Sequence, residues 1–216
     1  MSKFNYINNK KREEYVAKLA CEFLRNRMPE IGQFDSMASP LDDMCKKFDF
    51  YTKVTEEKDP DDIFNFERRF KIQLKVRSFK FMDYKDIITR LSTTGKTWIS
   101  EVNSGEADYV LECFLDTEDP EISWRGSSIV GIYVLNIKDI KEKFTIVPYL
   151  PVDSLFLGNA FKACLYPTSR FGSIDNDILL IPVKSFGKDS YGLKFEKDMI
   201  NEYCPNSFKS FKLSEE

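Results

Sequence analysis

The stretch FKIQLKVR at residues 70–77 alternates apolar and polar side chains without interruption. Strict alternation is the pattern of a β-strand that buries one face and leaves the other polar. Such a strand places Gln73 and Lys75 side by side on its polar face, separated by the inward-pointing Leu74. An oxygen donor two residues from a lysine suits a metal-dependent phosphodiesterase, but ordinary half-exposed strands carry the same pair. The neighbouring segments therefore have to distinguish the two interpretations.

A second alternating segment, residues 46–54, places Phe48 and Phe50 on one face and Asp49 on the other. The acidic segment 56–62, with its proline, is a turn signal, so the two strands are expected to pair antiparallel. Asp49 is thereby expected to lie beside the polar face of the first strand.

Residues 10–28 show the clearest helical pattern, with apolar side chains recurring every three or four residues. Asn8 or Asn9 is expected to cap the helix, and Pro29 marks its exit. Glu13 falls on the apolar stripe, where a carboxylate needs a partner. In the alternative, Glu13 is exposed in the first turn, where its charge favours the helix dipole.

The rest of the chain alternates short strand-like runs with helical and loop segments. Beyond Pro148, prolines separate short apolar runs, and an irregular, loop-rich tail is expected. Further strands are expected at 97–102, 107–115 and 128–135, and short helices at 83–91 and 137–144, the second capped by Asn136. The pattern predicts an α/β or α+β protein in a single domain over 1–216, with a core at about 10–145 and a C-terminal extension at about 146–216.

Composition indicates an ordinary soluble globular protein. The 216 residues are 42% apolar and 31% charged, and no run is long enough to span a membrane. The amino-terminal residues lack the apolar core of a signal peptide, so a cytoplasmic protein is expected. Five scattered cysteines without a CxxC pair indicate reduced thiols, mostly in the core.

The chain contains no histidine. This excludes Ser-His-Asp hydrolases, Cys-His proteases, histidine-ligated zinc sites and nucleases with a histidine base. Hydrolytic chemistry would have to use carboxylates, amides, lysine, tyrosine or serine, and a hard cation held by oxygen atoms is the natural complement.

The net charge is only −3, but the charges are segregated. Residues 67–97 contain nine basic side chains against three acids, and residues 106–122 contain seven acids and no base. A basic zone beside an acidic one is typical of a face that binds a polyanion and concentrates cations. A solvated mixed surface would show the same charge runs.

The run LSTTGKT at 91–97 is not a nucleotide-binding phosphate loop. That motif requires glycine at the position of Arg90 and a strand before it. We therefore expect a polar loop there and no nucleotide cofactor.

Taken in order, these segments resemble the PD-(D/E)xK, restriction-endonuclease-like nuclease superfamily. IQLKVR at 72–77 resembles the superfamily variant in which glutamine replaces the acid, and FDFY at 48–51 resembles the strand that carries the aspartate. REEYVAKLACEFL at 12–24 resembles the opening helix. TTGKTWISEVNSGEADYVL at 93–111 resembles a downstream run of some phage and bacterial members. The resemblance covers roughly residues 10–135.

This resemblance implies an α/β fold with a mixed central sheet flanked by helices, followed by the loop-rich extension. It also implies a DNA endonuclease that uses Mg²⁺ or Mn²⁺. Asp49, Gln73 and the Leu74 carbonyl would ligate the metal, Lys75 would activate water, and Glu13 would complete the site. Glu101 and Asp108 would be supporting residues, Lys71, Arg77 and Lys80 would contact DNA phosphates, and a homodimer would cut both strands.

The neutral Gln73 departs from the superfamily pattern, because it leaves the site with one negative charge fewer. Two alternatives therefore stay open. In one, the nuclease fold is catalytically weak or inactive and serves as a DNA-binding or protein-interaction subunit. In the other, the chain is an unrelated α+β domain, and 70–77 is only a half-exposed strand.

Overall fold

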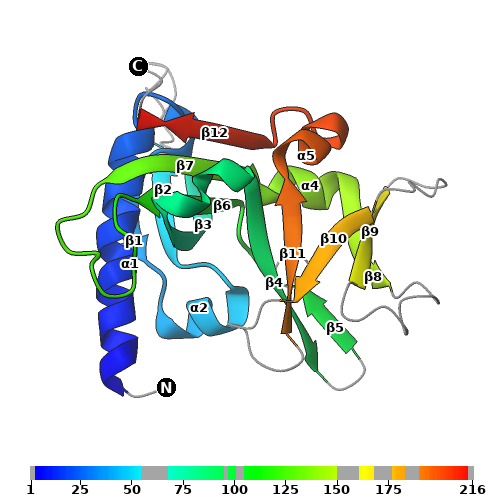
Figure 1. Ribbon diagram of the computed structural model, residues 1–216, viewed down its shortest axis with the longest axis horizontal. Helices are drawn as coiled ribbons and strands as arrows, with labels where there is room; N and C mark the ends of the chain where they lie inside the picture. Colours follow the sequence, from blue (N-terminus) through cyan, green and yellow to red (C-terminus); the bar gives the residue numbers. More distant parts are fainter. Residues whose placement is uncertain are drawn as a thin grey trace, which may run out of the picture. The chain divides into compact units, whose positions relative to one another are not determined.

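The computed structural model describes residues 3–54, 68–94, 97–100, 105–149, 161–167, 177–182 and 190–213. The chain divides into two compact units (Figure 1). Unit 1 comprises Met1–Tyr84, Ala107–Val134 and Ser210–Glu216, and unit 2 comprises Lys85–Glu106 and Leu135–Lys209. Every candidate site residue that the structure describes belongs to unit 1.

Unit 1 is built on a six-stranded sheet in the order β1-β2-β3-β6-β7-β12. The β1–β2 and β2–β3 pairs are antiparallel, whereas β3–β6 is parallel. The sheet is therefore mixed, which confirms a mixed α/β protein and the predicted antiparallel pairing of the first two strands. Its strands are β1 (Gln33–Met37), β2 (Phe50–Val54), β3 (Arg68–Ser78), β6 (Tyr109–Leu115), β7 (Ile129–Asn136) and β12 (Phe208–Lys212).

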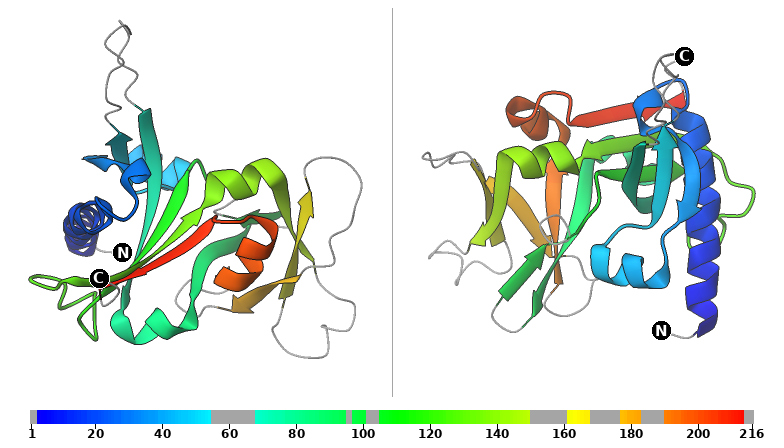
Figure 2. Two further views of the ribbon diagram at one scale, coloured as in Figure 1. Left: turned by 90° about the horizontal axis from the view of Figure 1, so that it is seen from above. Right: turned by 180° about the vertical axis from the view of Figure 1, so that it is seen from behind.

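The helix α1 (Lys3–Leu24) covers one face of this sheet (Figures 1 and 2). Its buried stripe includes Val16, Ala20 and Leu24, which join Ile72 and Leu74 of β3 in one hydrophobic core. The expected helix is confirmed, but it begins several residues before the asparagines that were expected to cap it.

Two short elements separate α1 from β2. The 3-10 helix η1 (Pro29–Ile31) begins at Pro29, the residue expected to mark the helix exit, and β1 follows it in a stretch where no strand was predicted. The helix α2 (Pro40–Lys46) begins where the Ser39 hydroxyl accepts a hydrogen bond from the Asp42 N–H at 3.1 Å. Because α2 extends to Lys46, β2 is shorter than the predicted strand.

The 3-10 helix η2 (Phe79–Tyr84) follows β3, and the chain then enters unit 2 as β4 (Asp86–Thr94). The helix expected at 83–91 is therefore wrong. The run DIITRLSTT is rich in β-branched residues, which favour a strand.

Unit 2 contains a second six-stranded sheet in the order β5-β4-β11-β10-β9-β8, with every neighbouring pair antiparallel. Its remaining strands are β5 (Thr97–Ser100), β8 (Phe144–Tyr149), β9 (Phe161–Pro167), β10 (Asp177–Pro182) and β11 (Ser190–Glu196). The described residues after Pro148 thus lie largely in strands. For these residues, the predicted irregular tail is wrong.

Two short helices belong to unit 2, α4 (Ile137–Lys143) and α5 (Lys197–Tyr203). The predicted cap of α4 is confirmed, because the Asn136 Oδ1 atom accepts a hydrogen bond from the Asp139 N–H at 3.0 Å. Within the described part of the chain, no helix has both the length and the apolar character needed to cross a membrane.

Candidate metal and phosphate site

Asp49 lies immediately before β2, and both its backbone N–H and its backbone carbonyl make hydrogen bonds. Its N–H donates to the Ile72 carbonyl at 2.8 Å, and its carbonyl accepts from the Ala38 N–H at 2.8 Å. The Asp49 Oδ2 atom accepts a hydrogen bond from the Leu74 N–H at 2.6 Å. Since β2 begins at Phe50, opposite Ile72, the carboxylate binds β3 just beyond the end of the strand pairing. Asp49 is thus fixed at the edge of β3.

Gln73 and Lys75 are the two chain neighbours of Leu74, so their Cα atoms lie about 3.8 Å from that of Leu74. The Leu74 side chain is buried in the core beneath α1. Because side chains alternate along a strand, Gln73 and Lys75 project from the opposite face of β3. The structure therefore brings the Asp49 carboxylate to the backbone of the Gln-x-Lys motif.

The charges that act on Asp49 come from α1 and α2. The ammonium of Lys10 lies 2.8 Å from Glu13 Oε2 and 2.7 Å from Asp43 Oδ2. Burial, followed by the nearby negative charge of Glu13, raises the pKa of Asp49 from 3.8 to about 7. The Leu74 N–H and Lys10 act in the opposite direction. Asp49 thus titrates close to neutral pH.

Lys10 is a site residue that the sequence interpretation missed. Burial lowers its pKa, but the hydrogen bonds and charges of Asp43 and Glu13 outweigh burial, so the pKa of Lys10 is raised. Glu13 is half-buried on α1 and pairs with Lys10. This ion pair supplies the partner that a carboxylate on the apolar stripe of the helix requires. The available signal was the spacing of three residues between a lysine and a glutamate on one helix.

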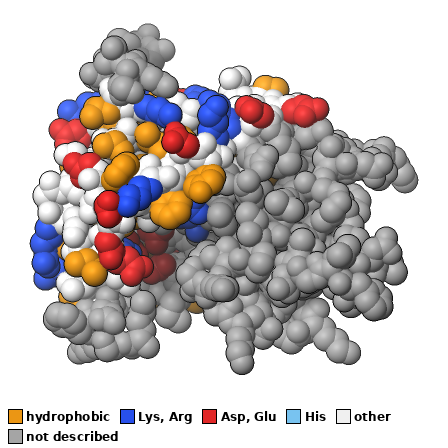
Figure 3. All heavy atoms as spheres, viewed as in Figure 1, with side chains coloured by type: hydrophobic (Ala, Val, Ile, Leu, Met, Phe, Trp, Pro, Cys, Tyr) orange, Lys and Arg blue, Asp and Glu red, His pale blue; other side chains and the backbone are white. Residues whose placement is uncertain are grey.

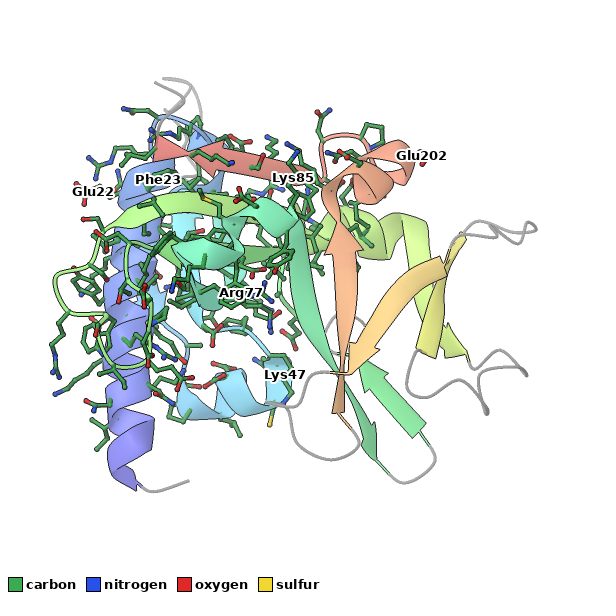
Figure 4. All side chains as sticks on the ribbon, in the orientation of Figure 1. Glu22, Phe23, Lys47, Arg77, Lys85 and Glu202 are labelled. Atoms are coloured by element: carbon green, nitrogen blue, oxygen red, sulfur yellow. The ribbon has the colours of Figure 1, made fainter. Side chains whose placement is uncertain are left out.

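On the polar face of β3, Lys75 is in register with Glu112 of β6. Glu112 is 0% exposed, and its Oε1 atom lies 2.6 Å from Nε of Arg77. Figure 4 labels Arg77 on β3. A buried carboxylate is tolerated when it is paired in this way. Glu112 was also missed, and its signal was a single acid within an otherwise apolar strand.

Asp108 holds the other edge of β3, as Asp49 holds the first. The Lys71 N–H donates to Asp108 Oδ2 at 2.8 Å, and the Asp108 N–H donates to the Lys71 carbonyl at 2.8 Å. Asp108 thus supports β3 through its backbone. Glu101, the other expected supporting residue, lies outside the described residues.

The candidate phosphate contacts lie at different points along β3 and η2. The Lys71 ammonium lies 5.7 Å from the centre of the Phe48 ring, and the Lys80 ammonium lies 2.8 Å from Glu118 Oε1 in an exposed ion pair. Arg77, the third candidate, pairs with Glu112 as described above.

The oxygen donors expected to bind a metal are one carboxylate (Asp49), one amide (Gln73) and one main-chain carbonyl (Leu74). Mg²⁺ prefers such hard oxygen ligands and retains several waters, so the donor chemistry fits this ion. Among the described residues, no group of three or more acidic or cysteine side chains has the geometry to hold a metal ion. Any metal at Asp49 would share Glu13 with the Lys10 ammonium.

Comparison with protein-family models, with curated proteins and with solved structures finds no match to this chain. What the fold itself defines is a mixed α/β protein with a six-stranded mixed sheet in unit 1. The function has to be argued from the site.

Proposed function

We propose that this protein is a Mg²⁺- or Mn²⁺-dependent DNA endonuclease with a restriction-endonuclease-like core, acting in the cytoplasm. The hydrogen bond between the Asp49 carboxylate and the Leu74 N–H carries the proposal. It brings the aspartate that immediately precedes β2 to the centre of the Gln-x-Lys motif on β3. Unlike Asp108, which makes the corresponding contact at Lys71, Asp49 binds the backbone between Gln73 and Lys75 and has Glu13 nearby.

In this proposal, Asp49, the Gln73 amide oxygen and the Leu74 carbonyl hold the metal. A metal held there would polarise the scissile phosphate and lower the pKa of a coordinated water. Lys75 would orient that water or accept its proton, and Glu13 would supply a second carboxylate beside Asp49. Because the pKa of Asp49 is about 7, its carboxyl group is only partly ionised at neutral pH. A bound cation would favour the ionised form, so metal binding and ionisation of Asp49 would reinforce each other.

DNA would be held by the cations that line β3 and its extension into η2. Lys71 and Arg77 lie on β3, and Lys80 is the second residue of η2. Two copies of the chain would be needed to cut both strands at one place, so we propose a homodimer on DNA.

The experiment is cleavage of supercoiled plasmid in Mg²⁺ or Mn²⁺, with EDTA as the metal-free control. Lys75→Ala is expected to abolish nicking while retaining DNA binding in a mobility-shift assay. Lys18→Ala is the matched control, because Lys18 is an exposed lysine on α1 that pairs with Glu14 in an i,i+4 contact. Plasmid that stays intact in both metals, or cleavage that survives Lys75→Ala, would overturn the proposal.

The second candidate is a nuclease fold that binds DNA or a protein partner without cutting. One observation favours it: a lysine ammonium, that of Lys10, already pairs with the carboxylates of Glu13 and Asp43 near Asp49. Such a protein is expected to bind DNA in a mobility-shift assay, or its protein partner in a pull-down, equally well with and without EDTA. Lys75→Ala is expected to leave that binding unchanged.

A further inference from the structure

A row of side chains leads from the interior of unit 1 to its surface at η2. It begins at the buried Glu112, continues through Arg77 and ends at the aromatic rings of Phe81 and Tyr84. The Arg77 Nε atom lies 2.6 Å from Glu112 Oε1, and its Cζ atom lies 5.7 Å from the centre of the Phe81 ring. The Arg77 guanidinium thus contacts both a buried carboxylate and an exposed aromatic ring.

The two rings at the outer end are exposed. Phe81 is 46% exposed and Tyr84 is 64% exposed, and their centroids lie 6.2 Å apart at an interplanar angle of 29°. Phe79, also on η2, is exposed as well. Figure 3 shows hydrophobic side chains beside lysine or arginine side chains on the face that includes η2. Neighbouring exposed aromatic rings on a soluble protein indicate a binding surface.

Two lysines close to these rings in the chain or by ion pairing form exposed ion pairs in which a phosphate could replace the carboxylate. Lys80 pairs with the exposed Glu118, and the Lys212 ammonium lies 4.0 Å from an oxygen of Asp83, whose side chain is almost fully exposed. Exposed ion pairs of this kind are weak. A phosphate oxygen can therefore replace the carboxylate at either lysine at little cost.

We propose that Arg77 and η2 bind an unpaired stretch of nucleic acid. Phe81 and Tyr84 stack on exposed bases, Arg77 and Lys80 bind the adjoining phosphates, and Glu112 acts as a positioning residue that orients Arg77. Flat aromatic rings beside fixed cations are the arrangement by which proteins hold single strands.

This inference rests on the proposed function and specifies its substrate: DNA with unpaired bases beside the cleaved bond. The first residue of η2, Phe79, follows Lys75 by four positions, which is about 13 Å along a strand. The start of η2 thus lies a few nucleotides from the proposed reacting phosphate, since a stacked strand advances about 3.4 Å along its axis per nucleotide.

The test is binding of a fluorescein-labelled oligothymidylate, followed by fluorescence anisotropy in EDTA so that no cleavage occurs. The double variant Phe81→Ala/Tyr84→Ala is expected to raise the dissociation constant for the oligothymidylate at least about tenfold, with a much smaller effect on a duplex of the same length. Ile122→Ala is the matched control, because Ile122 is an apolar side chain, 78% exposed, that lies away from η2 in the sequence. Tyr84→Ser alone, at a side chain that is 64% exposed, is expected to weaken oligothymidylate binding in the same direction with little effect on folding.

Arg77 is tested through the salt dependence of the same binding. Arg77→Met is expected to reduce the slope of log affinity against log salt by about 0.7, the value for one phosphate contact on a single strand, whereas Lys18→Met leaves it unchanged. Glu112→Gln is expected to weaken oligothymidylate binding while retaining most of this slope, since the cation remains but is no longer oriented. A loss caused only by unfolding would appear in circular dichroism and would affect duplex and single strand alike.

Equal oligothymidylate binding by wild type and the double variant, or a wild type that does not bind the oligothymidylate, would overturn this inference. Its failure is distinguishable from that of the nuclease proposal. A protein that binds the oligothymidylate through Phe81 and Tyr84 but never cleaves overturns only the nuclease. A protein that cleaves plasmid through Lys75 without any effect of these rings overturns only the stacking surface.

Discussion

The carboxylate of Asp49 accepts a hydrogen bond from the backbone N–H of Leu74 at 2.6 Å. This contact joins the residue before β2 to the centre of β3, at the point where the backbone pairing of the two strands ends. Asp108 and Lys71 make the corresponding contact on the other edge of β3. The central strand is thus held at both edges by an aspartate that immediately precedes the neighbouring strand.

Asp49→Asn is expected to change stability in a pH-dependent way. The raised pKa of Asp49 means that its contribution to stability is present below about pH 4 and is lost as pH rises through about 7. Asparagine can still accept from the Leu74 N–H but does not ionise. We expect the stability of the variant relative to wild type to increase by about 2 kcal/mol between about pH 5 and about pH 8.5, in urea unfolding.

Asp35→Asn is the control for that experiment. Its hydrogen bond to Arg69 lowers the pKa of Asp35, so the carboxylate is ionised throughout this pH range. The stability difference from wild type should therefore be the same at both pH values. An Asp49→Asn difference that also stays constant with pH contradicts the assignment of Asp49 as a group that titrates near neutrality.

Lys10→Met is expected to destabilise unit 1, because it leaves the half-buried carboxylates of Glu13 and Asp43 without their shared cation. We expect a loss of about 2 kcal/mol in chemical unfolding, less than for a fully buried pair. Lys18→Met, which removes an exposed pair on the same helix, should cost no more than about 0.5 kcal/mol. Equal losses for the two variants would show that the Lys10 cluster contributes nothing beyond a surface contact.

Arg77 and Glu112 are expected to be energetically coupled. Arg77→Met leaves the fully buried Glu112 carboxylate without its 2.6 Å partner and should cost about 3 kcal/mol. Arg77→Met combined with Glu112→Gln should be less destabilised than the sum of the single variants. A double-mutant cycle measured by chemical unfolding checks this, and strict additivity would contradict the coupling.

Gly32→Ala is expected to be strongly destabilising. Gly32 has φ +83°, and an added Cβ would collide with the backbone carbonyl of Lys53 on β2. We expect a loss of about 3 kcal/mol in thermal or chemical unfolding. Gly126 also has positive φ (+77°), but an added Cβ there meets nothing within 4 Å, so Gly126→Ala should cost only about 1 kcal/mol. Similar losses would mean that the collision at Gly32 is relieved by a small movement of β2.

Strands with uninterrupted patterns could be predicted from the sequence. The alternation at 70–77 and the apolar runs that became β6 and β7 were recognisable because periodicity directly reflects which face is buried. β1 could not be recognised, since QFDSM is short and no residue in it is fully buried. In unit 2, the prolines at the ends of β9 and β10 were interpreted as loop signals, although they only end those strands.

The candidate site was predictable in part for the same reason. Strand pairing follows from local pattern and turn signals, so the approach of Asp49 to the Gln-x-Lys motif could be anticipated. The roles of Lys10 and Glu112 could not. They depend on α2 lying against α1, and on β6 pairing with β3 from a distant part of the sequence. The spacing of Lys10 and Glu13 and the single acid in β6 are local signals, but neither identifies these distant partners.

The most direct test of the central claim is the rate of supercoiled-plasmid nicking in Mn²⁺ by wild type, Lys75→Ala and Asp49→Asn, beside Lys18→Ala. The nuclease account predicts metal-dependent nicking by wild type and Lys18→Ala. It predicts a loss of at least about a hundredfold in both site variants, each of which still binds DNA. Wild-type protein that binds DNA but does not nick it in either metal, or nicking that both site variants retain, would contradict the account.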